Sequence, residues 1–366
     1  MKILLLIAGS RSGSDFFQSL LDSHSQILQF PGELRIDENF KKMLCYNEAN
    51  LISKKFIELN PYFFESKQNL IERHNKLGKF KNQSFSVNKN SFKNIFSKLY
   101  IKDKDNANKY KTLLKLHQAY ELSKGGNIKN KKIIFINTHL PTYTKEFIKL
   151  IDYKNIEIIY SFRNPLSSLS STIKNWLNYK NGNHFAYSSL FFHFNLIFKG
   201  FEDIKKMKKK TFVVQLENLH RKNNLVMKSF CKLYSLKNEK CLKKSTYHGL
   251  LWWGDEISEK YINGINKKYT IKYNKNFFYN RDIIFFESLS KYINKKYGYP
   301  ITVKNKKNYI FNIFPMKCEL MIWKNMIKNL KIKEILALPY YYIMRIIFIN
   351  NLTVKKLKFP NSIGNI

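Results

Sequence analysis

The sequence predicts an α/β protein with a doubly wound, parallel sheet, and three observations lead to this prediction. Short apolar runs rich in β-branched residues recur along the 366 residues. Each run is followed by a segment whose apolar residues repeat at helical spacing. Strands and helices therefore alternate, which is typical of a parallel sheet that binds its ligands at the carboxyl ends of its strands. The expected strands cover residues 3–8, 133–137, 156–162 and 211–216, with a short one at 27–30.

The first predicted strand ends in a turn of small residues that suits an anion. The apolar run 3–7 leads into Arg11, Ser12, Gly13 and Ser14, and a helix is predicted to follow. A strand, a tight turn and a helix present backbone N–H groups to a bound phosphate. Gly13 allows close approach, the two serines add hydroxyl groups, and Arg11 adds a fixed positive charge.

A second predicted strand ends in a similar arrangement of charge and hydroxyl. The run 156–162 is followed by Arg163, then by Asn164 and Pro165, which suit the N-cap and first position of a helix. Ser171 lies eight residues after Arg163, about two turns into that helix. Arg163 and Ser171 therefore form a candidate second anion clamp.

These two motifs together resemble those of sulfotransferases that use 3′-phosphoadenosine 5′-phosphosulfate (PAPS). In that family, a turn like Arg11–Ser14 grips the 5′ end of the nucleotide. An arginine and a serine eight residues apart, here Arg163 and Ser171, grip its 3′-phosphate. The resemblance implies a P-loop NTPase-like sheet, PAPS as co-substrate and no metal. Arg11 is also expected to stabilise charge on the departing phosphate.

Weaker matches suggest two candidates for the catalytic base. Glu33 lies in surroundings similar to those of tyrosylprotein sulfotransferases, where a glutamate is the base. His139 lies in a Thr-His-Leu-Pro segment that resembles cytosolic sulfotransferases, where the histidine is the base. Trp252 belongs to a Gly-x-x-Trp-x-Gly-like loop and is a candidate for stacking on adenine, although a tryptophan of this kind is more often core. We expect Glu33 to be the base and His139 to contribute.

The sequence departs from the family pattern at two places. Asp15, which is expected to lie beside the nucleotide, stands where many members have a second threonine donor, so a carboxylate replaces one hydroxyl donor there. Asn137 replaces a lysine that often precedes the Thr-His pair, which favours Glu33 over His139 as the base. Glu217, by contrast, is expected to orient a loop through hydrogen bonds.

The expected organisation is a sulfotransferase domain over residues 1–300, with a helical insertion at 38–130, and a basic, aromatic helical tail at 301–366. The tail contains a basic stretch with Lys304, Lys306 and Lys307, followed by an apolar run at 335–349. That run is shorter than the ~20 apolar residues of a spanning helix. It fits a helix packed on the core or one lying on a membrane surface.

Composition restricts the partners. Lys and Arg number 65 against 26 Asp and Glu, a net charge of +39, but the lysines are spread along the chain without a nucleic-acid-binding motif. The expected partners are PAPS and a hydroxyl-bearing or amine acceptor. The acceptor is expected to be a glycan because bacterial members of the family often act on carbohydrates, with a lipid or small molecule as alternatives. Four cysteines without a C-x-x-C pair fit a cytoplasmic protein, peripheral to the inner face of a membrane if the tail binds there.

Two other functions remain open from the sequence. A P-loop kinase would carry a lysine after the glycine of the turn, but Ser14 follows Gly13. A non-catalytic protein that binds membranes or polyanions through its positive charge would show salt-dependent binding without turnover.

Overall fold

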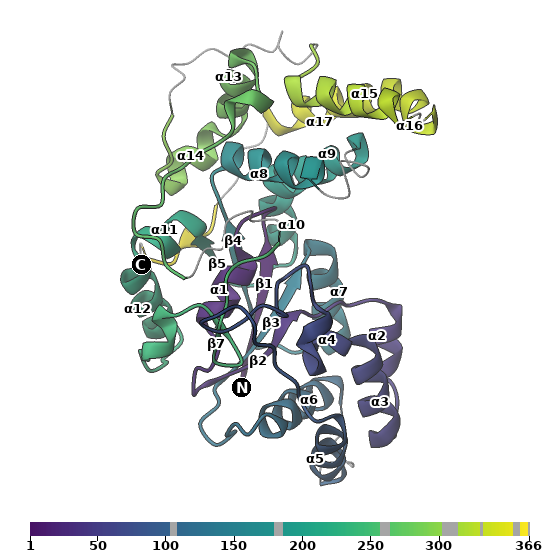
Figure 1. The fold of residues 1–366 in the computed structure, drawn as a ribbon, viewed down its shortest axis with the longest axis vertical. Helices are drawn as coiled ribbons and strands as arrows, with labels where there is room; N and C mark the ends of the chain where they lie inside the picture. The colour runs from purple at the N-terminus through teal and green to yellow at the C-terminus, as the bar shows by residue number, and fades with distance from the viewer. Residues whose placement is uncertain are drawn as a thin grey trace.

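A computed structural model describes residues 1–102, 108–178, 186–256, 264–301, 314–329, 332–353 and 359–364. Its centre is a parallel six-stranded sheet with the order β2-β3-β1-β4-β5-β8 (Figure 1). The predicted α/β fold class is therefore confirmed. The strands are β1 (Lys2–Ala8), β2 (Ile27–Glu33), β3 (Ile133–His139), β4 (Ile156–Phe162), β5 (Thr211–Gln215) and β8 (Asn361–Ser362). A separate antiparallel hairpin pairs β6 (Thr246–Tyr247) with β7 (Leu250–Leu251).

Both faces of the sheet are buried, as its near-continuous apolar strands require. In β1, Ile3 and Leu5 face one apolar cluster, whereas Leu4 and Leu6 face another. The first cluster lies under the helices of the insertion, and the second lies under helices that follow β1 and β5. Because the strands are parallel, the carboxyl ends of β1, β2, β3 and β4 lie at one edge of the sheet, where Arg11, Glu33, His139 and Arg163 follow or end them.

The helices before β4 include those of the predicted insertion. They are α1 (Ser14–Leu20), α2 (Glu38–Met43), α3 (Ala49–Leu59), α4 (Pro61–Phe64), α5 (Lys89–Ile101), α6 (Lys109–Ser123) and α7 (Pro141–Ile151), with a 3₁₀ turn, η1, at Ser66–Gln68. The helices α2–α5 pack phenylalanines, such as Phe56 and Phe92, into one cluster, to which α6 adds Leu113 and Leu116. The insertion is therefore helical, as predicted.

The helices after β4 cover the other end of the molecule. They are α8 (Pro165–Asn178), α9 (Tyr187–Phe194), a π-helical stretch η4 (Asn195–Lys199), α10 (Gly200–Lys206), α11 (Leu216–Arg221), α12 (Asn223–Leu233), the 3₁₀ turns η5 (Lys240–Lys243) and η6 (Lys275–Phe277), α13 (Asn280–Leu289) and α14 (Lys291–Tyr297). α8 begins at Pro165, as Asn164 and Pro165 predict. Asn164 is its N-cap, because its side chain accepts a hydrogen bond from the N–H of Ser167 at 3.0 Å.

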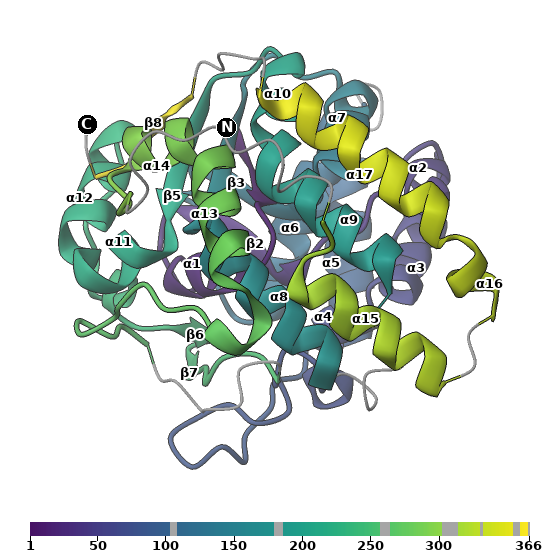
Figure 2. The ribbon, with the colours of Figure 1, turned by 90° about the horizontal axis from the view of Figure 1, so that it is seen from above.

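The tail forms three helices before it returns to the sheet. They are α15 (Lys317–Lys328), α16 (Ile332–Leu336) and α17 (Leu338–Thr353). They lie as an outer layer beyond α8 and α9 (Figures 1 and 2). Among the described residues, no helix combines the length and apolar character needed to cross a bilayer. Lys304, Lys306 and Lys307 of the predicted basic stretch lie outside the described residues.

Candidate functional site

The turn after β1 has the backbone of an anion-binding loop. Ser10, Arg11 and Gly13 all have left-handed backbones, with φ values of 55°, 42° and 79°. Within the described part of the chain, no acceptor is seen for the backbone N–H groups of Arg11, Ser12 and Gly13. Unpaired N–H groups on a tight turn provide a favourable environment for a phosphate or sulfate.

Gly13 is required by both its conformation and its surroundings. A Cβ atom at this position would lie 2.5 Å from Cδ1 of Leu216, which belongs to α11. That distance is far below an ordinary carbon–carbon contact, and the positive φ disfavours any larger residue. The close approach of β5 and α11 therefore fixes the loop from one side.

Side chains from the neighbouring strand and helix hold the loop from the other side. The hydroxyl of Ser161 in β4 donates to the carbonyl of Ser12 at 2.9 Å, and that of Ser168 in α8 donates to the carbonyl of Ser10 at 2.5 Å. Ser12 Oγ accepts from the N–H of Gly9 at 3.0 Å, so its own proton remains available for a ligand. These bonds give the loop a defined shape without using the N–H groups above.

A partly buried chain of hydrogen bonds supports the strained backbone at Ser10. The Trp176 indole N–H donates to His193 Nε2 at 3.1 Å, and because an indole can only donate, the neutral ring carries its proton on Nδ1. That proton faces Ser10 Oγ at 2.7 Å, and Ser10 Oγ lies 3.1 Å from Oγ1 of Thr172. Burial, with help from Arg11, lowers the pKa of His193 to about 3, so the ring stays neutral. Sequence reasoning missed His193 because only the fold brings α9 to this loop.

The two predicted arginines lie next to each other at the ends of β1 and β4. Arg163 Nη1 donates to the carbonyl of Arg11 at 3.4 Å. The Nε atoms of Arg11 and Arg163 are buried, and neither has a hydrogen-bond partner among the described residues. Buried, unpaired guanidinium N–H groups are costly unless an anion accepts them.

A buried glutamate positions the start of α8 and hence Arg163. Glu217 Oε1 accepts from the backbone N–H of Asn164 at 2.9 Å, and Oε2 accepts from the hydroxyl of Tyr299, also at 2.9 Å. Only 2% of Glu217 is exposed. These bonds match the expected orienting role of Glu217.

The remaining predicted nucleotide-binding residues lie in different surroundings. Ser171 lies in the second turn of α8 and is half-buried. No hydrogen-bond partner is seen for its hydroxyl among the described residues. Tyr269 lies near Arg163, which partly offsets the rise in the pKa of Tyr269 caused by burial. Trp252 is buried, and its ring meets that of Tyr247 edge to face, with 5.5 Å between the ring centroids. Its proposed stacking on adenine stays a prediction.

Both candidate bases lie at the carboxyl ends of adjacent strands, close to Asp15. Glu33 ends β2 and pairs with Asn137 of β3, and His139 ends β3. Asn137 donates to Asp15 Oδ1 at 3.2 Å, and its Oδ1 accepts from the backbone N–H of His139 at 3.1 Å. Burial raises the pKa of Glu33, and nearby His139 and Arg35 oppose this rise.

Two further carboxylates, which sequence reasoning did not select, belong to the same group. Asp255 forms an ion pair with Arg11, with 2.9 Å between Oδ2 and Nη1. Glu72 belongs to the insertion and lies against Gly32, the residue before Glu33. Its Oε2 atom is 3.3 Å from the point that a Cβ atom would occupy if Gly32 carried one. Burial, with added repulsion from Asp15, raises the pKa of Glu72 to about 8. No sequence signal marks Glu72, because its position depends on how the insertion folds back.

The insertion reaches the site through hydrogen bonds to the loop around Trp252. The Trp252 indole donates to the carbonyl of Glu72 at 2.7 Å, and the Trp253 indole donates to the carbonyl of Gly78 at 2.6 Å. Backbone bonds join Gly78 to Leu251 at 2.8 Å and connect residues 256 and 71 at the same distance. The two segments thus act as one unit beside Arg11.

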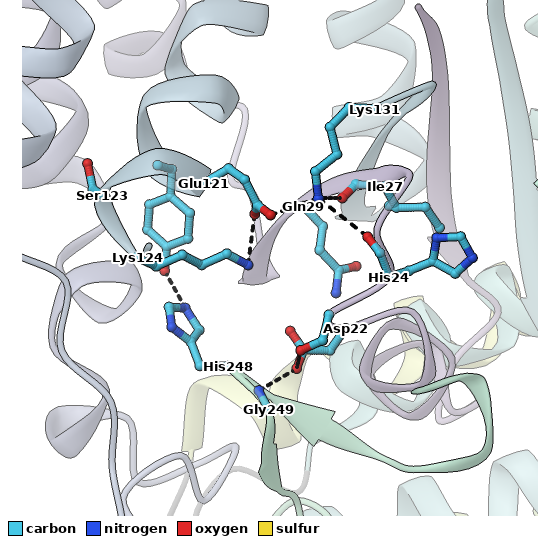
Figure 3. Close-up of polar contacts among 12 residues, drawn as sticks. Asp22, His24, Ile27, Gln29, Glu121, Ser123, Lys124, Lys131, His248 and Gly249 are labelled. Atoms are coloured by element: carbon cyan, nitrogen blue, oxygen red, sulfur yellow. Dashed lines mark hydrogen bonds and ion pairs between the residues drawn. The ribbon is translucent and has the colours of Figure 1, made fainter. Parts of the chain in front are cut away.

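Two sets of polar contacts lie near the start of β2, one to the hairpin and one to α6 (Figure 3). Asp22 Oδ2 accepts from the backbone N–H of Gly249 at 2.8 Å, which anchors the hairpin. Lys131 donates to the carbonyl of Ile27 at 2.8 Å and to Glu121 of α6 at 2.7 Å. The start of β2 is therefore bonded to α6 through Lys131, and the turn that precedes β2 is bonded to the hairpin through Asp22.

Comparisons with known proteins give weak similarities. The sulfotransferase domain from the Synechococcus PCC 7002 olefin synthase is 11% identical, with 70% of this chain and 79% of that chain covered and a TM-score of 0.39. The sulfotransferase domain from the curacin biosynthetic pathway is 15% identical, with coverages of 82% and 98% and a TM-score of 0.39. No family model and no curated protein matches the chain. Similarities at this level carry no weight in assigning a function.

Proposed function

We propose that this protein is a sulfotransferase that moves a sulfuryl group from PAPS to a hydroxyl or amine of an acceptor. One observation carries the proposal: Arg11 and Arg163 meet at the ends of adjacent strands, each with a buried, unpaired guanidinium Nε. PAPS carries phosphate groups at both its 5′ and 3′ positions. Two neighbouring arginines, one on the turn and one beside it, suit such a ligand. We further propose a carbohydrate as the acceptor.

The loop would hold the 5′ end of the nucleotide. Its N–H groups at Arg11, Ser12 and Gly13 would bind the anion, and Ser14 and Asp15 follow in the first turn of α1. Arg163, with Ser171 two turns further along α8, would bind the 3′-phosphate. Asp255 and Asp15 limit the positive charge near Arg11, so an incoming anion would compete with Asp255 for this guanidinium.

The reaction would be an in-line displacement at sulfur. The acceptor oxygen or nitrogen forms a bond to sulfur, the bond from sulfur to the 5′-phosphate oxygen breaks, and its electron pair leaves with adenosine 3′,5′-bisphosphate (PAP). The acceptor proton passes to a base on the protein. Arg11 and the loop N–H groups would stabilise the charge that develops on the departing phosphate oxygen.

Glu33 is our choice for the base. Burial raises the pKa of its carboxyl, which makes the carboxylate a better proton acceptor than an exposed glutamate. His139 lies close enough to influence the ionisation of both Glu33 and Asp15. We propose that His139 orients the acceptor or holds sulfuryl oxygens while Glu33 accepts the proton.

The nucleotide assignment is tested by comparing PAP with AMP, which lacks the 3′-phosphate. Arg163→Ala should weaken PAP binding about 10- to 100-fold, about 1.5–3 kcal/mol for a lost charged hydrogen bond, and affect AMP much less. Arg281→Ala is the control because it removes an arginine that is not assigned to the nucleotide. Arg281 donates instead to the carbonyl of Pro315, just before α15. Titration calorimetry gives both affinities. Equal losses for the two nucleotides would contradict the assignment of Arg163.

The transfer itself is tested by incubating the protein with PAPS and cell extracts, then searching for sulfated products by mass spectrometry. We expect PAP release together with a product heavier by one sulfuryl group. PAP binding without any sulfated product would support a non-catalytic protein on this fold. Binding of ATP in preference to PAP would support the kinase alternative.

A further inference from the structure

The outer face of the tail helices exposes an apolar surface. No other stretch of similar length in the described chain exposes as many large apolar side chains. Leu336 and Ile332 of α16 are 75% and 65% exposed. The apolar face, as we call this surface, consists of Trp323, Ile327, Ile332, Leu336, Tyr340, Ile343 and Ile347.

The helices that carry the apolar face are firmly attached to the rest of the molecule. Tyr341, Phe348 and Ile349 of α17 are buried in a cluster with α8, α9 and α13. Beneath them, the Arg345 side chain pairs with Glu319 of α15 at 2.7 Å, and both are almost completely buried. The predicted apolar run therefore divides into an inner side that packs on the core and an outer side that remains exposed.

The exposed residues share one side of α17. Tyr340, Ile343 and Ile347 are spaced by three and four residues, which places them in one stripe along the helix. The three tail helices lie together on one side of the molecule, with α16 joining α15 to α17 (Figure 2). The apolar face is thus presented by a single outer layer.

Basic residues outnumber acidic ones on these helices, with Lys317, Lys324, Lys328, Lys333 and Arg345 against Glu319 and Glu334. Lys324, Lys328 and Lys333 are exposed, whereas Glu319 is buried and paired with Arg345. The whole chain carries a net charge of +39. Such a charge disfavours pairing two copies of the chain through this face and favours an anionic partner. Exposed apolar and aromatic groups beside lysines are typical of proteins that lie on anionic bilayers.

We propose that the apolar face docks the protein onto the surface of an anionic lipid bilayer. Trp323, Tyr340 and the aliphatic side chains would enter the boundary between headgroups and acyl chains. Lys324, Lys328 and Lys333 would contact the lipid phosphates. This inference does not depend on the proposed sulfotransferase activity.

The test uses the full chain and substitutions on the outer side only, because the chain returns to the sheet after α17. The variant Leu336→Asp/Ile343→Asp is compared with Ile101→Asp/Leu225→Asp, which makes the same charge change at exposed positions on α5 and α12. Binding is measured by co-sedimentation with vesicles of phosphatidylcholine, with or without phosphatidylglycerol. We expect the first variant to bind the anionic vesicles at least about 10-fold more weakly and the second to bind like the wild type.

The contribution of charge is tested separately. Lys324→Gln/Lys328→Gln/Lys333→Gln should weaken binding to anionic vesicles about 10- to 100-fold, whereas Lys228→Gln/Lys232→Gln/Lys240→Gln on another face should have a much smaller effect. Unchanged binding by the first aspartate variant would overturn the proposal. So would light scattering that shows a dimer in the wild type and a monomer in that variant, because a second copy would then cover the face. PAP affinity, measured in the same samples, reports on the nucleotide site independently.

Discussion

At Glu33 the environment favours proton transfer. The carboxyl lies at the end of a strand, where burial raises its pKa above the ordinary value of 4.5. His139 and Arg35 stabilise the carboxylate, so the rise is limited. A base whose pKa approaches the working pH combines a substantial ionised fraction with good proton affinity. Asn137, between Glu33 and Asp15, holds this part of the site through its side-chain amide.

The first prediction concerns Glu33→Gln. If Glu33 is the base, this change should leave PAP affinity near that of the wild type and lower kcat at least ~100-fold. In the wild type, kcat/KM should fall as the pH decreases through the raised pKa of Glu33, because protonation removes the base. The variant should lose this dependence. Initial rates with PAPS between pH 4 and 9 measure both effects.

His139→Ala is the matched comparison. We expect a smaller loss of kcat and retention of the acid limb, since Glu33 would still accept the proton. A loss of ~100-fold in His139→Ala, with most of the activity kept in Glu33→Gln, would reverse the assignment.

The second prediction concerns Glu72 and stability. Burial raises the folded-state pKa of Glu72 to about 8, above the ordinary value of 4.5. The folded protein therefore binds this proton more tightly than the unfolded chain does, and Glu72 lowers stability as the pH rises from 4.5 to 8. Its side chain keeps 24% exposure, so we expect Glu72→Gln to stabilise the fold by about 1–2 kcal/mol at pH 9. This gain should disappear near pH 4.

Urea denaturation at several pH values measures this difference. Glu48→Gln, at an exposed position before α3, is the control and should show little pH-dependent gain. A constant difference between Glu72→Gln and wild type across the pH range would contradict the raised pKa.

At the scale of elements, the start of α8 links helix stability to the nucleotide site. The Asn164 side chain caps α8, and its backbone N–H is held by Glu217. Arg163 immediately precedes this cap. A disturbed N-terminus of α8 should therefore displace the guanidinium that we assign to the 3′-phosphate.

The third prediction compares two N-caps. Asn164→Ala and Asn88→Ala each remove a side chain that accepts from the backbone N–H three residues later, at 3.0 Å in α8 and 2.8 Å in α5. Each should lower the free energy of unfolding by about 1 kcal/mol. Only Asn164→Ala should also weaken PAP binding, which calorimetry detects. Equal PAP affinities in the two variants would show that the cap does not position Arg163.

The elements that the sequence predicts well have local causes. Residues 156–162 form β4 as predicted because a short apolar run rich in isoleucine suits a strand that is buried on both faces of a parallel sheet. β8 was not anticipated, because Asn361 and Ser362 are polar and carry no strand pattern. They join the sheet through backbone pairing with β5 and through Ser362 Oγ, which donates to Gln215 at 2.8 Å. Such pairing depends on the fold of the whole chain.

The candidate site also contains some residues that the sequence predicts and others that only the fold brings together. The turn around Gly13 and the start of α8 have short-range signatures and could be located from the sequence. His193 and Glu72 lack such signatures, since His193 reaches Ser10 and Glu72 reaches Gly32 from elements distant in sequence. Prediction from sequence therefore identifies the motifs that we propose to bind an anion but not the residues that adjust their charge and shape.

At the scale of the whole molecule, the segment around Ile363 is part of the core. The N–H of Ile363 donates to the carbonyl of Val213 in β5 at 2.8 Å, and the side chain is completely buried beside Val214 and Val226. The tail helices lie beyond α8 and α9 (Figure 1), and β8 lies at the edge of the sheet beside β5 (Figure 2). Outer helices and sheet should therefore unfold together.

The last prediction uses Ile363→Ala to test whether the outer helices and the sheet unfold together. Removing a fully buried side chain leaves a cavity between β5 and α12, which should cost about 2–4 kcal/mol of unfolding free energy. Ile301→Ala, where the side chain is 40% exposed, should cost well under ~1 kcal/mol and serves as the control. Urea denaturation followed by both circular dichroism and tryptophan fluorescence gives the two values. Because Trp323 lies on α15 and Trp252 lies beside the hairpin, coincident shifts of both signals in Ile363→Ala would show that the tail and the sheet unfold as one unit. A fluorescence transition that separates from the loss of helix, or a cost as small as that of Ile301→Ala, would instead show that the end of the chain only rests on the sheet edge.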